Sequence, residues 1–182
     1  MFLSIKESFE EIRIMLERDM KRLRITISEE ESKKFEDEEE RKDLLANNDK
    51  LTQIARKLCF SLVKIAEDLH YYFAENTPKE LEEPLTILRY YMHFFYVKVQ
   101  RAVSSEFEDR EMEKEYSTID AKNSAFLSYV STVKIINALK IISQNKKMNS
   151  GINQKVKKII PLFEDLNMVL ENRFDFDFKS ES

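Results

Sequence analysis

Apolar residues recur at steps of three and four along most of the chain, the spacing that places side chains on one face of an α-helix. The pattern is strongest from Pro84 to Val103. One row there consists of Leu81, Leu85, Leu88, Met92, Phe95, Val99 and Ala102. A second row, which contains Tyr91 and Phe94, makes most of the circumference apolar. A helix of this kind has to be covered on nearly every side, so we expect it to be the central, aromatic-rich helix of a bundle.

Stripes with the same spacing predict four further helices, over about 5–27, 51–74, 117–148 and 152–170. For the helix that starts near residue 117, the spacing predicts one core face. Its members are Ile119, Phe126, Val130, Val133 and Ile136, widened by Leu139 and Ile142.

Several residues carry signals for helix ends. Asn47-Asn48-Asp49 predicts an N-cap for the second helix. Thr77-Pro78-Lys79-Glu80 reads as cap, first-turn proline and reciprocal glutamate for the third. Gly151 is expected to end the fourth helix in a left-handed conformation, and Pro161 to kink or divide the last.

Composition supports a purely helical fold. A chain of 182 residues with one glycine and three prolines has few residues for tight turns. We therefore predict an all-α, mostly antiparallel bundle of four to five helices. A single domain is expected over 1–174, followed by a flexible tail over 175–182. Within it, 28–46 is a charged linker or a helix extension, and the sequence leaves open whether Ser28–Asp43 is helical.

The location of the protein is predicted from its cysteine content and its longest apolar stretch. A single cysteine, Cys59, excludes an intrachain disulfide and favours a reducing compartment. The apolar stretch 84–103 contains Arg89, His93, Lys98 and Arg101, and charges at the centre of a span are costly. We expect a cytoplasmic protein without a membrane span.

Two histidine-containing pairs are the candidates for enzymatic chemistry. Glu67 and His70 have the spacing that carboxylate-bridged di-iron bundles use for metal ligands, but such sites need the pair twice. Arg89 and His93 lie one turn apart and could polarise a phosphate. An antiparallel turn near Thr77 would separate the two histidines by roughly 13 Å along the axis. A metal- or nucleotide-dependent enzyme is therefore the alternative hypothesis, and no cofactor is expected.

Charge is distributed unevenly along the chain. No acidic residue occurs between Ala121 and Phe163, whereas eight lysines do. Such segregation can steer an anionic partner, unless the acidic and basic segments neutralise one another within the fold or across a dimer. A weak nucleic-acid or anionic-ligand site in the Lys-rich region 122–158 is a further alternative, although nucleic acid is the less favoured partner.

The leading hypothesis is a non-catalytic bundle that acts through protein–protein interaction as an adaptor, assembly or regulatory protein. Its partner would be an acidic protein or a second copy of the chain. The residues predicted to make the contacts are Lys140, Lys146, Lys147, Lys155, Lys158, Tyr90, Tyr91 and Phe94.

Overall fold

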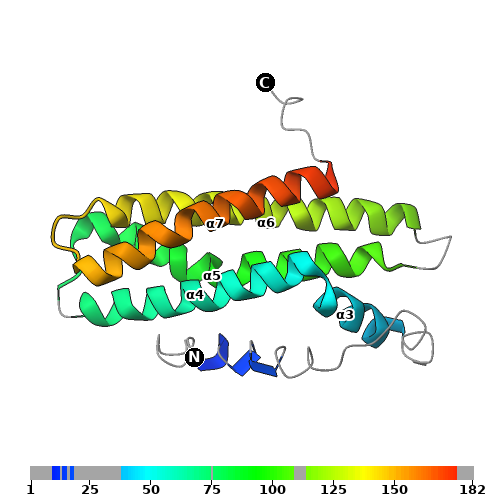
Figure 1. Cartoon of the computed structure of the whole chain (residues 1–182), viewed down its shortest axis with the longest axis horizontal. Helices are drawn as coiled ribbons and strands as arrows, with labels where there is room; N and C mark the ends of the chain where they lie inside the picture. The colour runs from blue at the N-terminus through cyan, green and yellow to red at the C-terminus, as the bar shows by residue number, and fades with distance from the viewer. Residues whose placement is uncertain are drawn as a thin grey trace.

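A computed structural model describes residues 10–12, 14–15, 17–18, 38–74, 76–108 and 114–175. These residues form helices and connecting turns and contain no strand. The helices with full bounds are α3 (Glu38–Asn48), α4 (Lys50–Tyr72), α5 (Lys79–Glu106), α6 (Lys114–Ser143) and α7 (Ser150–Phe174). The predicted all-α bundle of mostly antiparallel helices is confirmed (Figure 1).

Helices α4 to α7 follow one another up and down the long axis (Figure 1). Each contacts the helix before and after it, and α7 closes the ring against α4. Helix α3 packs against α4 and α5 at one end. Helix α5 therefore touches three of these helices. It is nevertheless not covered on all sides, since the side chain of Tyr90 is 70% exposed.

The core of the bundle is supplied mainly by the large apolar residues of α4, α5 and α7. Phe95 of α5 meets Phe163 of α7 edge to face, with ring centroids 5.2 Å apart. The buried thiol of Cys59 donates to the carbonyl of Met92 at 3.0 Å. A buried arginine on α4, Arg56, donates from Nε to the hydroxyl of Tyr96 at 3.1 Å. These contacts fix the antiparallel register between α4 and α5.

Helix α6 faces the core with small residues. Its buried positions through the first two thirds are Ala121, Ser124, Ala125, Ser128, Ser131 and Thr132, and Ile135, Ile136, Leu139 and Ile142 follow. The hydroxyl of Ser128 donates to the carbonyl of Phe95 at 3.0 Å. Because α5 and α7 already fill the core with aromatic and aliphatic side chains, α6 can approach closely only with small residues on that side.

The predicted core face of α6 is correct in its last third, where Ile136, Leu139 and Ile142 are buried, and wrong at Ile119 and Phe126. Ile119 is 53% exposed and Phe126 is 40% exposed, whereas Val130 and Val133 are half-buried. Of the five positions, only Ile136 is buried. Ile119, Phe126 and Leu127 point away from the core, so the helix carries a second apolar face toward its exterior in addition to its buried isoleucines and leucine.

The helix ends agree with the sequence in part. Asp49 caps α4 as predicted, since its Oδ1 accepts the N–H of Leu51 at 2.8 Å. Thr77 does not cap α5: its hydroxyl donates to the carbonyl of Phe73 at 3.1 Å, and Pro78 occupies the N-cap position. Helix α5 runs through Pro84, which lies in its second turn, so the carbonyl of Glu80 receives no N–H from that position.

Two predictions about α7 are corrected. Gly151 does not end α6, which stops at Ser143; it lies in the first turn of α7 and has no positive φ. Asn149 caps that turn by accepting the N–H of Gly151 at 2.8 Å, and a Cβ on the glycine would lie 3.2 Å from the cap oxygen. Pro161 is exposed within a continuous helix and does not divide it.

Parts of the predicted organisation fall outside the described residues. Most of the stripe over 5–27 does, although Ile12 is half-buried against the core. Of the stretch Ser28–Asp43, residues 38–43 belong to α3. Of the tail, Asp175 ends α7 in a left-handed conformation with φ 46°.

Candidate interaction surface

The exterior of α6 carries a row of large apolar residues. Its members are Ile119, Phe126, Leu127, Val130, Val133 and Ile141, at helical spacing. Phe126, Leu127 and Ile141 are 40%, 43% and 48% exposed. The gaps in the row are filled by amides, at Asn123 and Asn137, and not by charges. No carboxylate occurs on α6 after Asp120.

The register between α5 and α6 brings aromatic residues of α5 beside this row. Lys134 donates to the hydroxyl of Tyr91 at 2.8 Å, and Ser128 to the carbonyl of Phe95. These two contacts align the stretch of α5 around Phe94 with the stretch of α6 that contains Leu127 and Val130. We define the α5–α6 face as Tyr90, Phe94, Val97, Phe126, Leu127 and Val130. Tyr90 and Val97 are exposed, and Phe94 is half-buried.

Basic residues border the α5–α6 face. Lys98 lies over the ring of Phe94 at 5.3 Å from the centroid, and Lys134 lies over the ring of Tyr91 at 4.9 Å. Cation–π contacts of this kind hold the ammonium groups beside the aromatic rings. On the opposite border of α6, Lys122 is exposed, and Lys140 pairs with Glu164 of α7 at 2.9 Å.

Arg101 and Asp120 close one end of the face. The guanidinium donates to both carboxylate oxygens, from Nε at 3.0 Å and from Nη2 at 3.1 Å. Ser105 adds a hydrogen bond to the same carboxylate at 3.0 Å. The hydrogen bond from Arg101 lowers the pKa of Asp120 despite its partial burial. The borders thus hold five basic residues against the carboxylates of Asp120, Glu164 and Glu171, the last of which accepts a hydrogen bond from Tyr129, whereas the whole chain carries a net charge of −4.

The structure distributes the eight predicted contact residues over several surfaces. Tyr90, Tyr91 and Phe94 lie together on α5, and Lys140 lies at the border of α6 with α7. Lys155 lies on another side, where it pairs with Asp68 of α4 at 2.7 Å.

The remaining lysines are also away from the α5–α6 face. Lys146 and Lys147 belong to the connection between α6 and α7, and Lys158 is exposed on α7. The Lys-rich region 122–158 is therefore not a single basic surface, and two of its lysines are paired with carboxylates of neighbouring helices.

The two histidines do not converge. The contacts of Arg56 with Tyr96 and of Cys59 with Met92 place His93 level with the middle of α4. By this register His70 is about eleven residues further along, roughly 17 Å at 1.5 Å per residue. The ring centroids of His70 and Tyr71 lie 5.5 Å apart. Among the described residues, no group of three or more His, Cys, Asp or Glu is placed to hold a metal ion.

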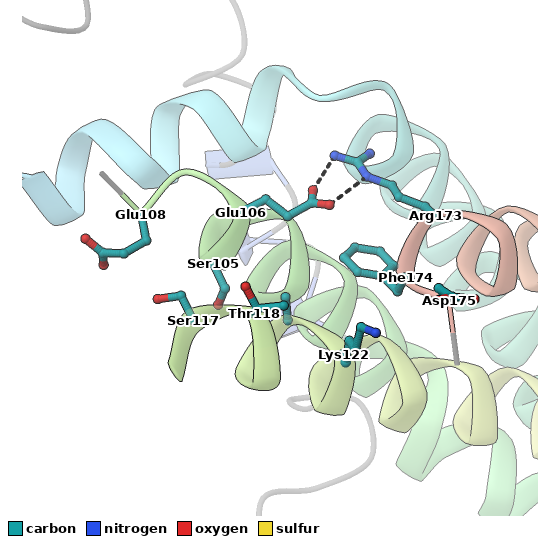
Figure 2. Close-up of a pocket in the computed structure, with 10 residues that line it drawn as sticks. Ser105, Glu106, Glu108, Ser117, Thr118, Lys122, Arg173, Phe174 and Asp175 are labelled. Carbon is teal, nitrogen blue, oxygen red and sulfur yellow. Dashed lines mark hydrogen bonds and ion pairs between the residues drawn. The ribbon is translucent and has the colours of Figure 1, made fainter. Parts of the chain in front are cut away.

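A polar cavity of about 390 Å³ lies where α5, α6 and α7 meet at the end of the bundle. Ser105, Ser117, Thr118 and Lys122 line it, together with Arg173 (Figure 2). An adjoining cavity of about 550 Å³ shares its serines and contains the buried ion pair of Lys42 and Glu108. Both linings mix acidic and basic groups, so neither predicts a ligand of one charge.

Arg173 of α7 contacts the ends of two other helices at this end of the bundle. Its guanidinium donates to Asp49 at the start of α4 at 2.8 Å and to Glu106 at the end of α5, as Figure 2 shows for the latter. Burial opposes the charge on Arg173, but hydrogen bonds to the two carboxylates outweigh it and raise its pKa. The donors of Arg173 are thus used in holding helix ends together.

Helix α6 is long and apolar enough to cross a membrane by those two criteria, the one such helix in the part of the chain that the structure describes. Its segment Glu115–Ser143 has a window with a mean hydropathy of 1.4, of which 50% is buried within the bundle. The core helix of a water-soluble bundle meets the same criteria, so the observation does not establish a span. What it adds is the exposed half of that window, which coincides with the outer apolar row of α6.

Sequence reasoning identified the aromatic part of the α5–α6 face and missed the α6 part, which it assigned to the core. The available signal was the run of alanine, serine and threonine at steps of three and four, the spacing of a buried face packed at close range. Comparisons with other proteins do not help to assign this surface, since no family model, curated protein or solved structure matches the chain.

Proposed function

We propose that the protein is a non-catalytic helical bundle that binds another protein through the α5–α6 face, in an adaptor, assembly or regulatory role in the cytoplasm. The observation that carries the proposal is the orientation of α6. Its small residues face the core, while Phe126, Leu127 and Val130 are left partly exposed beside Tyr90 and Val97. Contiguous apolar surface with a polar rim is typical of protein interaction sites.

The composition of the face supports binding over catalysis. Aromatic residues such as Tyr90 and Phe94 are enriched at protein interfaces, and apolar residues around them help to exclude water. The enzymatic alternative needs Glu67 and His70, or Arg89 and His93, to assemble a reactive site, and the register of α4 and α5 separates the two histidines. The proposal therefore involves no cofactor.

Site-specific photo-crosslinking in the native cell tests the proposal. The photoreactive amino acid p-benzoylphenylalanine replaces Leu127 on the α5–α6 face or, as a matched control, Leu162 on α7, which is 49% exposed. We expect a discrete adduct from position 127 that disappears when Val130→Asp is added, and none from position 162. Equal adducts from both positions, or none from position 127, would refute the proposal.

A further inference from the structure

We propose that the α5–α6 face receives an acidic amphipathic helix of a partner protein, laid along α6. This inference rests on the proposed function and specifies its partner. The exterior row of α6 extends from Ile119 to Ile141, a length of roughly 33 Å at 1.5 Å per residue. A helix of about six turns matches that length. Its apolar stripe would contact Leu127 and Val130, beside the aromatic residues of α5.

Charge decides the character of the partner. Lys98 and Lys134 lie where α5 meets α6, on one side of the outer row of α6, and Lys122 and Lys140 lie on its other side. Glu or Asp residues beside the apolar stripe of an incoming helix would reach these ammonium groups on both borders. Because the outer row itself contains no carboxylate, and Asp120 and Glu164 are already paired with Arg101 and Lys140, a helix with basic borders would meet mainly like charge.

The same charges argue against a second copy of the chain on this face. Two α6 helices packed against each other would bring the lysines of one against those of the other, which costs binding energy. The acidic stretch Ser28–Asp43 of a second copy could supply opposite charge, but its only large apolar residue is Phe35. That stretch cannot fill an apolar row six turns long.

An anionic membrane would supply negative charge for the bordering lysines but no hydrogen-bond partners for the amides of α6. Asn123 and Asn137 lie within the outer row of α6. Amides pressed into hydrocarbon would lack hydrogen-bond partners, and such burial is costly. A partner helix can offer polar side chains at the matching positions, as paired amides do in coiled coils, where they also fix the register.

The test uses the full chain and two fluorescent synthetic peptides. Both carry the same leucine stripe at helical spacing, interrupted by asparagines at the positions that would face Asn123 and Asn137, with glutamates on the borders in one peptide and lysines in the other. Fluorescence anisotropy measures their binding to the natural protein, to Leu127→Asp, to the double variant Lys122→Glu/Lys134→Glu, and to Leu162→Asp as a control. Flotation with phosphatidylglycerol and phosphatidylcholine vesicles measures membrane binding, and sedimentation velocity measures self-association.

We expect the natural protein and Leu162→Asp to bind the glutamate peptide at least about tenfold more tightly than the lysine peptide. Leu127→Asp abolishes this binding, and the double lysine variant reverses the preference. Equal affinity for the two peptides, no binding, binding that survives Leu127→Asp, flotation that depends on Leu127, or a dimer that depends on Leu127 would each overturn the inference. An adduct from position 127 together with any of these results would leave the proposed function standing and remove only the acidic helix.

Discussion

Ser128 and Leu127 are adjacent in α6, about 100° apart around its axis, and only Ser128 is buried, so exchanging their sizes tests how the helix is oriented. Ser128 is completely buried, whereas the side chain of Leu127 is 43% exposed. In Ser128→Leu, several methyl and methylene groups enter a filled space, which costs about 1–3 kcal/mol of unfolding free energy. Loss of the hydrogen bond to the Phe95 carbonyl adds roughly 1 kcal/mol. We therefore expect a total loss of about 2–4 kcal/mol.

Leu127→Ser is the matched change in the opposite direction. Complete burial of a leucine contributes about 1.5–3 kcal/mol, and this side chain is only partly buried, so its loss should cost about 1 kcal/mol. Urea unfolding followed by far-ultraviolet circular dichroism gives both free energies by linear extrapolation. A third variant, Ser128→Ala, keeps the space and removes only the hydroxyl; we expect it to cost no more than about 1 kcal/mol.

The opposite ranking would refute the reasoning. If Ser128→Leu were tolerated within about 0.5 kcal/mol while Leu127→Ser cost several kcal/mol, the large residues of α6 would be in the core. The α5–α6 face would then not exist as described. Equal slopes of free energy against urea concentration in all variants are the control that the unfolded states are comparable.

Other predictions concern the end of the bundle and the buried thiol. Arg173→Met leaves two partly buried carboxylates without their shared partner and should lower the unfolding free energy by about 2–4 kcal/mol in the same urea assay, with Arg173→Lys restoring only part because lysine cannot bond both in the same fork geometry. The lowered pKa of Asp120 makes its stabilising contribution fully present above its unfolded pKa of about 3.9 and lost as the pH falls through the folded pKa. Acid titrations of stability should therefore be shallower below about pH 4 in Arg101→Gln than in the natural protein, and identical slopes would contradict this. Cys59 is fully buried, so a thiol reagent should label it at the rate of unfolding, and rapid labelling of the folded protein would contradict its placement.

The fold class could be predicted from the sequence because it depends on features that are local and redundant. Stripes through α4, α5 and α7 have large apolar residues on one side, and the positions Leu62, Phe95 and Phe163 are buried as their spacing indicates. The cap at Asp49 also follows from local chemistry, since a carboxylate before a helix can accept a free N–H whatever surrounds it.

The orientation of α6 could not be predicted in the same way. Through the first two thirds of α6, large apolar residues lie on one side, and alanine, serine and threonine lie on the other. Hydrophobicity alone assigns the first side to the core. The closeness of α5 decides otherwise, since the carbonyl of Phe95 is within hydrogen-bonding distance of Ser128. That closeness is a tertiary property, and its one signal in the sequence of α6 is the run of alanine, serine and threonine at steps of three and four.

The predictions for two helix ends were wrong for a related reason. Thr77 and Gly151 have the residue types of a cap and of a helix end, yet each has a different role. The hydroxyl of Thr77 is used by the carbonyl of Phe73, the last turn of the preceding helix. Gly151 relieves crowding beside the cap oxygen of Asn149. The residue types correctly indicated that helix ends occur near these positions. The partner of each polar group, however, depends on the geometry of the turn.

The orientation of α6 is tested most directly by cysteine accessibility along the helix. Single cysteines at positions 124 to 134, in a Cys59→Ala background, are labelled with a maleimide, and the rates are compared with those in the unfolded chain. The account predicts fast labelling at Phe126, Leu127 and Lys134 and slow labelling at Ser124, Ser128 and Ser131. Fast labelling at the serines and slow labelling at Phe126 and Leu127 would contradict it.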